Sequence, residues 1–396
     1  MHKSRRMKPA TRALTVVTAS LGVFGANAAR AEITIKPYGF IRAEYTGASD
    51  AVGSFGNRNS IAPTEAYPVS GDVNTGYRDR FSVAQSRLGI DMKNAERTSG
   101  RVEVDFVDFT KGAPTTAALP RLRIAKIEYK ISDTLHVMAG QDWDLFSPLN
   151  PYTFNFVGNF FEAGNSGFIR QQVMIENKTD SFDITAGVGG AGTNNNGTDG
   201  AVEKTVAPAF ELRLTQILNP KMKWGVAGLV ENRTYLNGVS ATSESRNRMI
   251  HGLNIFGDFD MGPAFAIRVE AYQGTNLADQ NTMLTLSQGS FSNSVNEWGG
   301  YVSAKTQPSE NCTLFGTFGI AKVTDPDQLV SFNSGTTATF RGIQENVKAA
   351  LGTSYRLSGD TQLYFEASRF VTTYKTDGSP IVAQSTTGEL GLLWTL

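Results

Sequence analysis

Five arginines lie in segments where polar and apolar residues alternate, and their chemistry is the first indication of function. Arginine stays positively charged at every physiological pH, and its planar guanidinium binds a carboxylate through two parallel hydrogen bonds. Arginines gathered around one opening would therefore attract anions. The alternative interpretation is that each arginine pairs with a neighbouring acidic residue or with a lipid phosphate. The five residues are Arg42, Arg87, Arg121, Arg123 and Arg170.

Enzymatic chemistry has little support in the sequence. Beyond the N-terminal segment the only histidines are His136 and His251, and neither lies beside a nucleophile motif or at a metal-ligand spacing. A hydrolase would need serine, histidine and a carboxylate or amide within reach of one another. Cys312 is the single cysteine, so no internal disulfide can form. We therefore expect a non-enzymatic protein without a cofactor or a metal site.

Residues 1–31 predict an export signal. Clustered basic residues precede an apolar, small-residue stretch over 13–28, and Ala29 and Ala31 then frame a cleavage site before Glu32. Cleavage near Ala31 removes six basic residues and no acidic one, which leaves 31 Lys and Arg against 37 Asp and Glu, a net charge of −6. A mildly acidic exported chain is a poor candidate for binding nucleic acid.

The rest of the chain alternates between polar and apolar residues. Successive side chains of a strand point to opposite faces, so a period of two marks strands that separate an apolar from a polar medium. Ile33, Ile35 and Ile41 share one parity, for example, while Lys36 and Arg42 share the other. The segments are about ten to fourteen residues long, and a tilted strand needs about nine to eleven residues to cross a membrane. Further alternating segments fall near 87–92, 101–106, 126–131, 222–226, 363–367 and 390–396.

Short and long connections alternate between these segments. Seven short ones, rich in Asn, Asp, Gly and Pro, suit tight turns, and eight long ones are rich in Gly, Asn, Ser and Thr. Fifteen connections predict an all-β fold: residues 32–396 form one transmembrane antiparallel β-barrel of about sixteen strands. Such a barrel is too wide for side chains to fill, so an aqueous channel remains. The long connections are expected near 48–76, 110–120, 147–167, 190–206, 232–248, 274–293, 324–340 and 373–384.

Parity divides the basic residues of this barrel into two groups. One group opposes the apolar face of its strand and is expected to point into the lumen; its members are Arg42, Arg87, Lys126 and Arg170. Arg121 and Arg123 share the parity of the apolar Ile127. An inward orientation of these two arginines therefore requires a β-bulge or a position above the membrane.

Several motifs resemble those of Gram-negative outer-membrane porins. The second-strand pattern of these porins is similar to QSRLGI at 85–90. The DcaP-like branch of trimeric porins has an Arg-x-Arg strand before a Gly-Gln-x-Trp strand, which RLRIA at 121–125 and AGQDWDLF at 139–146 resemble, as does Arg170-Gln171 beyond them. The motifs cover roughly residues 38–176, and only barrel periodicity supports the resemblance over the rest of the chain.

The resemblance implies a homotrimer whose third long loop, here 147–167, folds inward and narrows the channel. Its prolines and phenylalanines would pack against the wall: Pro148, Pro151, Phe154, Phe156, Phe160 and Phe161. The acidic side of this constriction would consist of Asp142, Asp144 and Glu162. The basic wall would consist of Arg42, Arg87, Arg121, Arg123, Lys126 and Arg170. Opposed walls of this kind create a transverse field that orients dipolar solutes.

The expected function is that of an outer-membrane porin, a water-filled channel for passive diffusion of small hydrophilic solutes and ions, with a preference for anions and carboxylates. The expected surroundings are the lipid and lipopolysaccharide of a Gram-negative outer membrane, which the chain crosses many times. Two alternatives stay open. One is a non-conducting structural or adhesive barrel whose long loops bind partners, and the other is an outer-membrane hydrolase.

Overall fold

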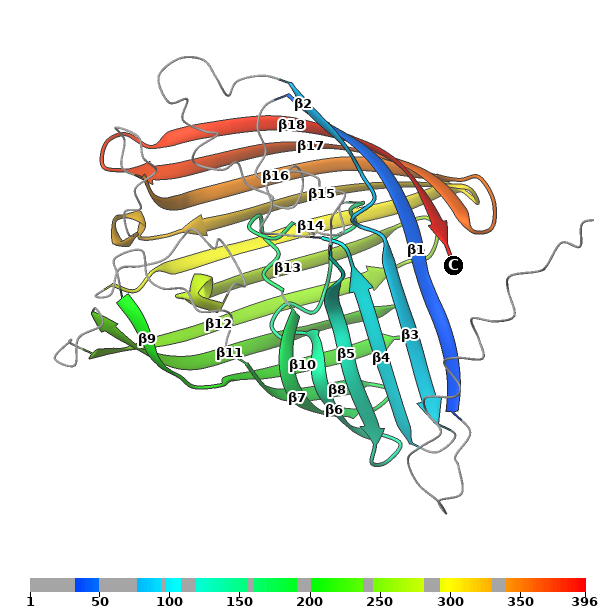
Figure 1. Ribbon diagram of the computed structural model, residues 1–396, viewed down its shortest axis with the longest axis horizontal. Helices are drawn as coiled ribbons and strands as arrows, with labels where there is room; N and C mark the ends of the chain where they lie inside the picture. The colour runs from blue at the N-terminus through cyan, green and yellow to red at the C-terminus, as the bar shows by residue number, and fades with distance from the viewer. Residues whose placement is uncertain are drawn as a thin grey trace, which may run out of the picture.

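Figure 1 shows the computed structural model, which describes residues 33–49, 77–94, 97–107, 119–154, 160–167, 169–190, 201–237, 245–280, 293–329 and 340–396. The predicted export signal at 1–31 and most of the connections predicted at 48–76, 110–120 and 190–206 lie outside the described residues. Within the described part of the chain, no helix is long and apolar enough to cross a membrane.

The described residues form eighteen strand segments of one sheet, and every paired segment runs antiparallel to its neighbour. Two short 3-10 helices, η3 (Leu277–Gln280) and η4 (Pro326–Gln328), lie between strands. The strand segments are β1 (Ile33–Ala48), β2 (Arg78–Ser82), β3 (Arg87–Asn94), β4 (Thr98–Asp105), β5 (Arg121–Lys130), β6 (Leu135–Trp143), β7 (Ile169–Lys178), β8 (Phe182–Gly189), β9 (Ala201–Val206), β10 (Ala209–Asn219), β11 (Met222–Asn237), β12 (Ser245–Asp260), β13 (Ala266–Thr275), β14 (Asn296–Ser309), β15 (Cys312–Val323), β16 (Phe340–Arg356), β17 (Thr361–Thr376) and β18 (Ile381–Thr395).

Two pairs of segments each form one interrupted strand. β2 and β3 both pair with β1, and β9 and β10 both pair with β11. The eighteen segments therefore make sixteen strands around the sheet. Pairing of β1 with β18 joins the first strand to the last, so the sheet closes into a barrel. The predicted closed, all-β barrel of sixteen antiparallel strands is confirmed.

Side chains alternate across the wall as the period of two predicts. On β18, Leu390 and Trp394 are 49% and 44% exposed, whereas Glu389, which points to the opposite face, is 4% exposed. On β1, Ile41 is exposed and the next residue, Arg42, is buried. Apolar side chains thus surround the barrel and polar side chains face its interior. In lipid, this closed arrangement satisfies the backbone hydrogen bonds and leaves no sheet edge.

Two of the predicted long connections are wrong because strands occupy most of them. β11 continues to Asn237 and β12 begins at Ser245, inside the connection predicted at 232–248. β17 continues to Thr376 and β18 begins at Ile381, inside the connection predicted at 373–384. Beyond the lipid belt both faces of a strand meet water. The strand can therefore continue with polar residues on both faces, and no alternation of polar and apolar residues reveals it in the sequence. Each of the seven predicted short turns, in contrast, contains a junction between consecutive strands.

The barrel wall is uneven in height. β3, β4 and β8 have eight residues each, whereas β11, β12 and β17 have sixteen. The strands β11 to β18, all of which except β13 have at least twelve residues, form one tall side of the barrel, and the strands β3 to β8, of eight to ten residues, form a low side (Figure 1). Below, the turn end is the end of the barrel with the short turns, and the loop end is the opposite end.

The largest apolar core lies inside the barrel. Phe146, which follows β6, packs with Tyr272 of β13 and with Leu277 of η3 in a cluster of buried side chains. The Phe146 and Tyr272 ring centroids are 6.5 Å apart in an edge-to-face arrangement. The cluster fixes the chain after β6 against the tall side of the wall.

Candidate functional site

A β-bulge on β5 turns part of the predicted basic wall inward. Glu103 of β4 pairs with Ile124 of β5. The next residue of β4, Val104, pairs with Leu122, which leaves Arg123 as the extra residue of the bulge. Leu122 is exposed on the outer face, whereas Arg123 is buried. The bulge that the parity of Arg123 required is therefore present.

Acidic neighbours neutralise the arginines of β5. The Arg121 guanidinium forms a two-pronged contact with Asp105, at 2.9 and 2.6 Å. Arg123 donates to Asp105 at 3.1 Å and to Glu103 at 2.8 Å. For these two residues the structure shows the pairing with neighbouring acids that the sequence left open as the alternative.

The predicted acidic and basic sides are neighbours on one wall. Lys126 Nζ lies 2.7 Å from Asp142 Oδ2 and 2.6 Å from Glu128 Oε1. Asp142 of β6 is also the register partner of Arg170 on β7. β5, β6 and β7 are consecutive strands of the sheet. The expectation that Asp142 faces the basic residues from an opposite wall is therefore wrong, because antiparallel pairing places them side by side.

Arg42 is fully buried, at 0% exposure, although its parity is inward as predicted. Its guanidinium lies 2.7 Å from Glu44 and 3.4 Å from Glu389 and covers the ring of Tyr364 at 4.6 Å from the centroid. It also donates a hydrogen bond to the backbone carbonyl of Phe154. Arg42 thus holds the chain after β6 against the wall and offers no exposed charge to a solute.

Arg170 and Asp144 form a second buried ion cluster. Arg170 Nε lies 3.4 Å from Asp144 Oδ2 and 3.3 Å from Glu211 Oε1. All three side chains are buried. Glu211 also accepts the Leu145 backbone N–H at 2.6 Å. These charges hold the chain where it leaves β6. We call residues 144–154 and 160–167 the anchored segment, and this ion cluster lies at its start.

Two further buried glutamates hold the middle of the anchored segment. Glu270 of β13 accepts the backbone N–H of Leu149 at 2.9 Å. Glu366 of β17 accepts the Phe154 N–H at 2.6 Å and the Thr153 hydroxyl at 2.8 Å. The segment therefore crosses from β6 to β13 and β17, whose glutamates follow their partners by 121 and 212 positions in the chain.

Residues 160–167 contact the tall side of the barrel. Glu162 has a φ of 65°, is 7% exposed, and its backbone carbonyl accepts Asn346 Nδ2 at 2.7 Å. The Phe160 ring lies under the Lys348 ammonium, 4.4 Å from the ring centroid. Glu162, like Asp144, is thus buried rather than exposed as the acidic side of a constriction. Phe156, which was also expected to pack this loop, lies outside the described residues.

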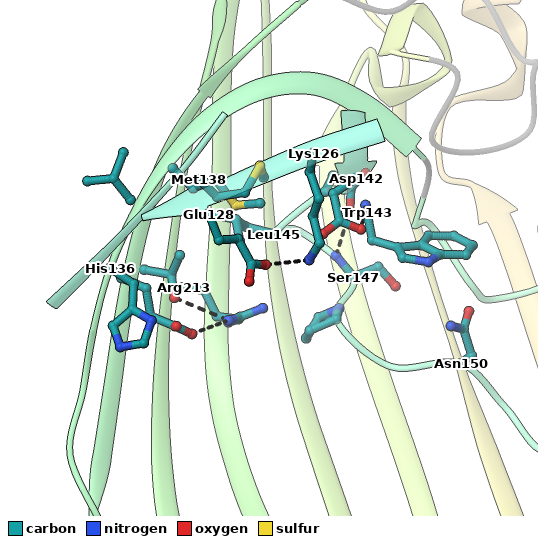
Figure 2. Close-up of a pocket in the computed structure, with 16 residues that line it drawn as sticks. Lys126, Glu128, His136, Met138, Asp142, Trp143, Leu145, Ser147, Asn150 and Arg213 are labelled. Atoms are coloured by element: carbon teal, nitrogen blue, oxygen red, sulfur yellow. Dashed lines mark hydrogen bonds and ion pairs between the residues drawn. The ribbon is translucent and has the colours of Figure 1, made fainter. Parts of the chain in front are cut away.

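A recess of about 300 Å³ beside the anchored segment holds charges of both signs (Figure 2). Lys126 and Asp142 face one another across its lining, and His136 lies at its turn-end side. Arg213 of β10 lies 3.3 Å from Asp183 and lines the same recess. The lining contains four carboxylates and two basic side chains, most of them in ion pairs, so this mixed recess does not favour anions.

A second recess, of about 400 Å³, is basic. Arg87, Arg268 and Lys305 line it, and no carboxylate does so among the described residues. Arg268 and Lys305 flank the ring of Tyr152, at 4.6 and 4.8 Å from its centroid. Asp258, which lies 3.2 Å from Arg268 and outside the lining, neutralises part of this charge. The basic recess is where positive charge faces open space beside the anchored segment.

Sequence reasoning missed Arg268, Lys305 and the three anchoring glutamates. All five lie on β10 to β17, beyond the motifs that pointed to the predicted site. Parity offers a signal: Arg268 and Glu270 alternate with Ile267 and Val269 on β13. It shows that these charges point inward, but not that the segment after β6 reaches them.

No cluster of three or more His, Cys, Asp or Glu side chains suited to a metal occurs in the described ranges. The acidic residues around η4 have other partners. Asp325 accepts hydrogen bonds from the backbone and side chain of Asn296, at 2.8 and 3.0 Å. Asp327 pairs with Lys375.

Comparison with known proteins identifies the fold. No protein-family model and no curated protein matches the chain. The crystal structure of the outer membrane channel DcaP of Acinetobacter baumannii is 16% identical, covers 94% of this chain and all of its own, and superimposes with a TM-score of 0.67. An anion-selective porin from Comamonas acidovorans is 10% identical, covers 92% of this chain and all of its own, with a TM-score of 0.56. Pseudomonas putida OprB is 10% identical, with 91% and 94% coverage and a TM-score of 0.54. The chain therefore has the fold of outer-membrane channels and porins.

Proposed function

We propose that this chain is an outer-membrane porin, a water-filled channel for the passive diffusion of small hydrophilic solutes. The observation that carries the proposal is the closed sixteen-strand wall, with apolar side chains outside and charged ones inside. A barrel of this size leaves an aqueous lumen. A porin fold hosts channels in the similar structures named above, and no described feature favours the adhesive or hydrolytic alternative.

The anchored segment would narrow that lumen. Glu211, Glu270 and Glu366 bind its backbone from three different strands, and Arg42 binds it from β1. Anchors on β1, β10, β13 and β17 spread around the wall, so the segment between them crosses the interior. In this proposal Arg42, Arg170, Asp144 and Glu162 position the constriction, in place of the solute contacts expected from the sequence.

The proposed selectivity is a preference for anions, carboxylates among them. The basic recess supports it, because Arg87, Arg268 and Lys305 face a space without a lining carboxylate among the described residues. The predicted wall of Arg121, Arg123 and Lys126 supports it less, because paired acids balance those charges. A charged lining of one sign biases which ions enter a pore.

The test is a planar-bilayer recording of the purified mature chain under a KCl gradient. Discrete conductance steps and a reversal potential of the sign for chloride permeation are expected. Swelling of liposomes in small sugars, with a cutoff for larger ones, would complement the recording. Absence of any conductance would reject the porin function, whereas a cation-selective reversal potential would reject only the anion preference.

The cellular setting is part of the proposal. We infer removal of residues 1–31, insertion into a Gram-negative outer membrane among lipopolysaccharide, and assembly as a homotrimer. The motifs that resemble those of trimeric porins support assembly. N-terminal sequencing of the membrane-extracted protein tests cleavage after Ala31, and a heat-sensitive high-mass band on a mildly denaturing gel tests the trimer.

A further inference from the structure

The outer face of β17 and β18 carries a positive charge that is unfavourable next to lipid acyl chains. Arg369 of β17 is exposed at outward parity, between the apolar outward residues Phe365 and Val371. Its guanidinium donates hydrogen bonds to the side chains of Thr386, at 2.9 Å, and Gln384 on β18. Both acceptors are neutral. Within the residues that the structure describes, no carboxylate pairs with Arg369.

This polar group has exposed apolar side chains on both sides of it along the wall. On β18, the exposed Val382 lies on the loop-end side of Gln384, and the exposed Leu390 lies on the turn-end side of Thr386. An arginine facing hydrocarbon is unfavourable, and more so with increasing distance from the interfaces. A protein surface that supplies an acceptor suits Arg369 better than acyl chains do.

An outward carboxylate lies on the same face. Asp79 of β2 is exposed, and it pairs in register with Gly47 of β1. Its carboxylate accepts the Tyr45 hydroxyl at 3.1 Å, and no cation neutralises it among the described residues. Gly47 in turn pairs with Gly388 of β18. Asp79 thus lies two residue pairs nearer the turn end than Arg369, with β18 and β1 between them.

The two charges cannot meet within one chain. Neighbouring strands are about 4.8 Å apart, so two intervening strands keep the backbones of β17 and β2 about 14 Å apart. The outward surface near Arg369 consists of small side chains, such as Ala349, Ala367 and Gly388. Small residues let a second backbone approach closely within a membrane. At the other edge Phe81 is 79% exposed.

We propose that the face formed by β17, β18, β1 and β2 is where copies of this chain contact one another, with Arg369 of one copy paired with Asp79 of the next. These four strands lie side by side in the wall (Figure 1). Complementary charges at the two edges of one face suit head-to-tail contacts that close into a ring. The inference rests on the proposed porin function and deepens it by naming the assembly surface.

The test measures the mass of the full mature chain, purified in mild detergent, by light scattering over a dilution series. Arg369→Glu and Asp79→Arg should each raise the half-dissociation concentration by about tenfold or more, because each leaves a like-charge contact in the interface. The double variant, in which the charges are exchanged, should regain the wild-type mass. Lys221→Glu reverses a charge in the β10–β11 turn, away from this face, and should assemble normally.

The milder variants Arg369→Gln and Asp79→Asn separate assembly from folding. Both should keep the heat-modifiable gel migration of a folded barrel, and both should show a lower assembly mass by light scattering. The proposal is overturned by a wild-type chain that stays monomeric, or by Arg369 variants of unchanged mass that copurify with less lipopolysaccharide. Failure of the double variant to recover overturns the Arg369–Asp79 pairing. Conductance of the dissociated monomer reports separately on the porin function, which stands if the monomer still conducts.

Discussion

Lys305 differs from the basic residues of β5 because no carboxylate pairs with it among the described residues. It contacts the ring of Tyr152, and within the described part of the chain it forms no ion pair. Arg121, Arg123 and Lys126, by comparison, each lie within about 3 Å of a carboxylate oxygen. An ion pair cancels most of the field beyond it, so an unshared charge has more influence on a passing ion.

Replacing Lys305 should therefore weaken the anion preference. We expect Lys305→Gln to lower the anion-to-cation permeability ratio by roughly two- to fivefold, the effect of about 0.5–1 kcal/mol at a partly solvated site. Reversal potentials under a KCl gradient give the ratio directly. Lys322→Gln, which removes the same charge from an outward side chain paired with Glu345, is the control and should leave the ratio unchanged. Equal ratios for Lys305→Gln and wild type would contradict the prediction.

Single-residue parity predicts the side of the wall to which a side chain points, but it does not predict the partner. Arg42 and Arg170 point inward as expected, yet both are buried against acids. Closure of the barrel joins β1 to β18 and brings Glu389 to Arg42. Glu211 reaches Arg170 from β10, across the intervening β8. Local alternation carries no information on such contacts, so the roles of these arginines needed the three-dimensional structure.

At the scale of elements, the anchored segment depends on glutamate side chains as hydrogen-bond acceptors rather than on regular structure. Three of its backbone N–H groups, which a helix or a sheet would pair with backbone carbonyls, bind glutamate side chains on β10, β13 and β17. Leaving such donors unpaired inside the barrel would be costly. Each glutamate therefore both orients the segment and satisfies its backbone.

Removing one acceptor should loosen the segment without opening the wall. We expect Glu366→Ala to lower the free energy of unfolding by about 1–3 kcal/mol, because the N–H of Phe154 and the hydroxyl of Thr153 lose their acceptor. Single-channel recordings should show a larger open-state current noise, and urea titration gives the stability. Glu310→Ala, at an exposed turn between β14 and β15, should change neither quantity. A quiet channel of wild-type stability would show that Glu366 does not anchor the segment.

At the scale of the whole molecule, alternation and turn chemistry predicted the closed sixteen-strand barrel because both follow from the contrast between lipid and water. The same contrast disappears beyond the membrane, which is why the strand extensions at Asn237 and Thr376 were not predicted. The β5 bulge is intermediate: parity required it, but only the register of β4 with β5 locates it at Arg123.

The uneven wall should also be uneven in local stability. We expect backbone amides of β11, β12 and β17 to exchange with deuterium more slowly than those of β3 and β4, because longer ladders open less readily at their centres. Exchange of the detergent-solubilised monomer, followed by mass spectrometry of peptides, measures this order. Uniform protection around the barrel would contradict it.

The positions of the anchors impose an order of events during biogenesis. Glu211, Glu270 and Glu366 all follow the anchored segment in the chain, and Arg42 reaches Phe154 from the first strand. The segment can reach all of its contacts only after β17 has formed and β18 has paired with β1. A partly assembled barrel would thus have a wider opening than the finished one. Binding of the anchored segment to the wall would narrow it as the last step of folding.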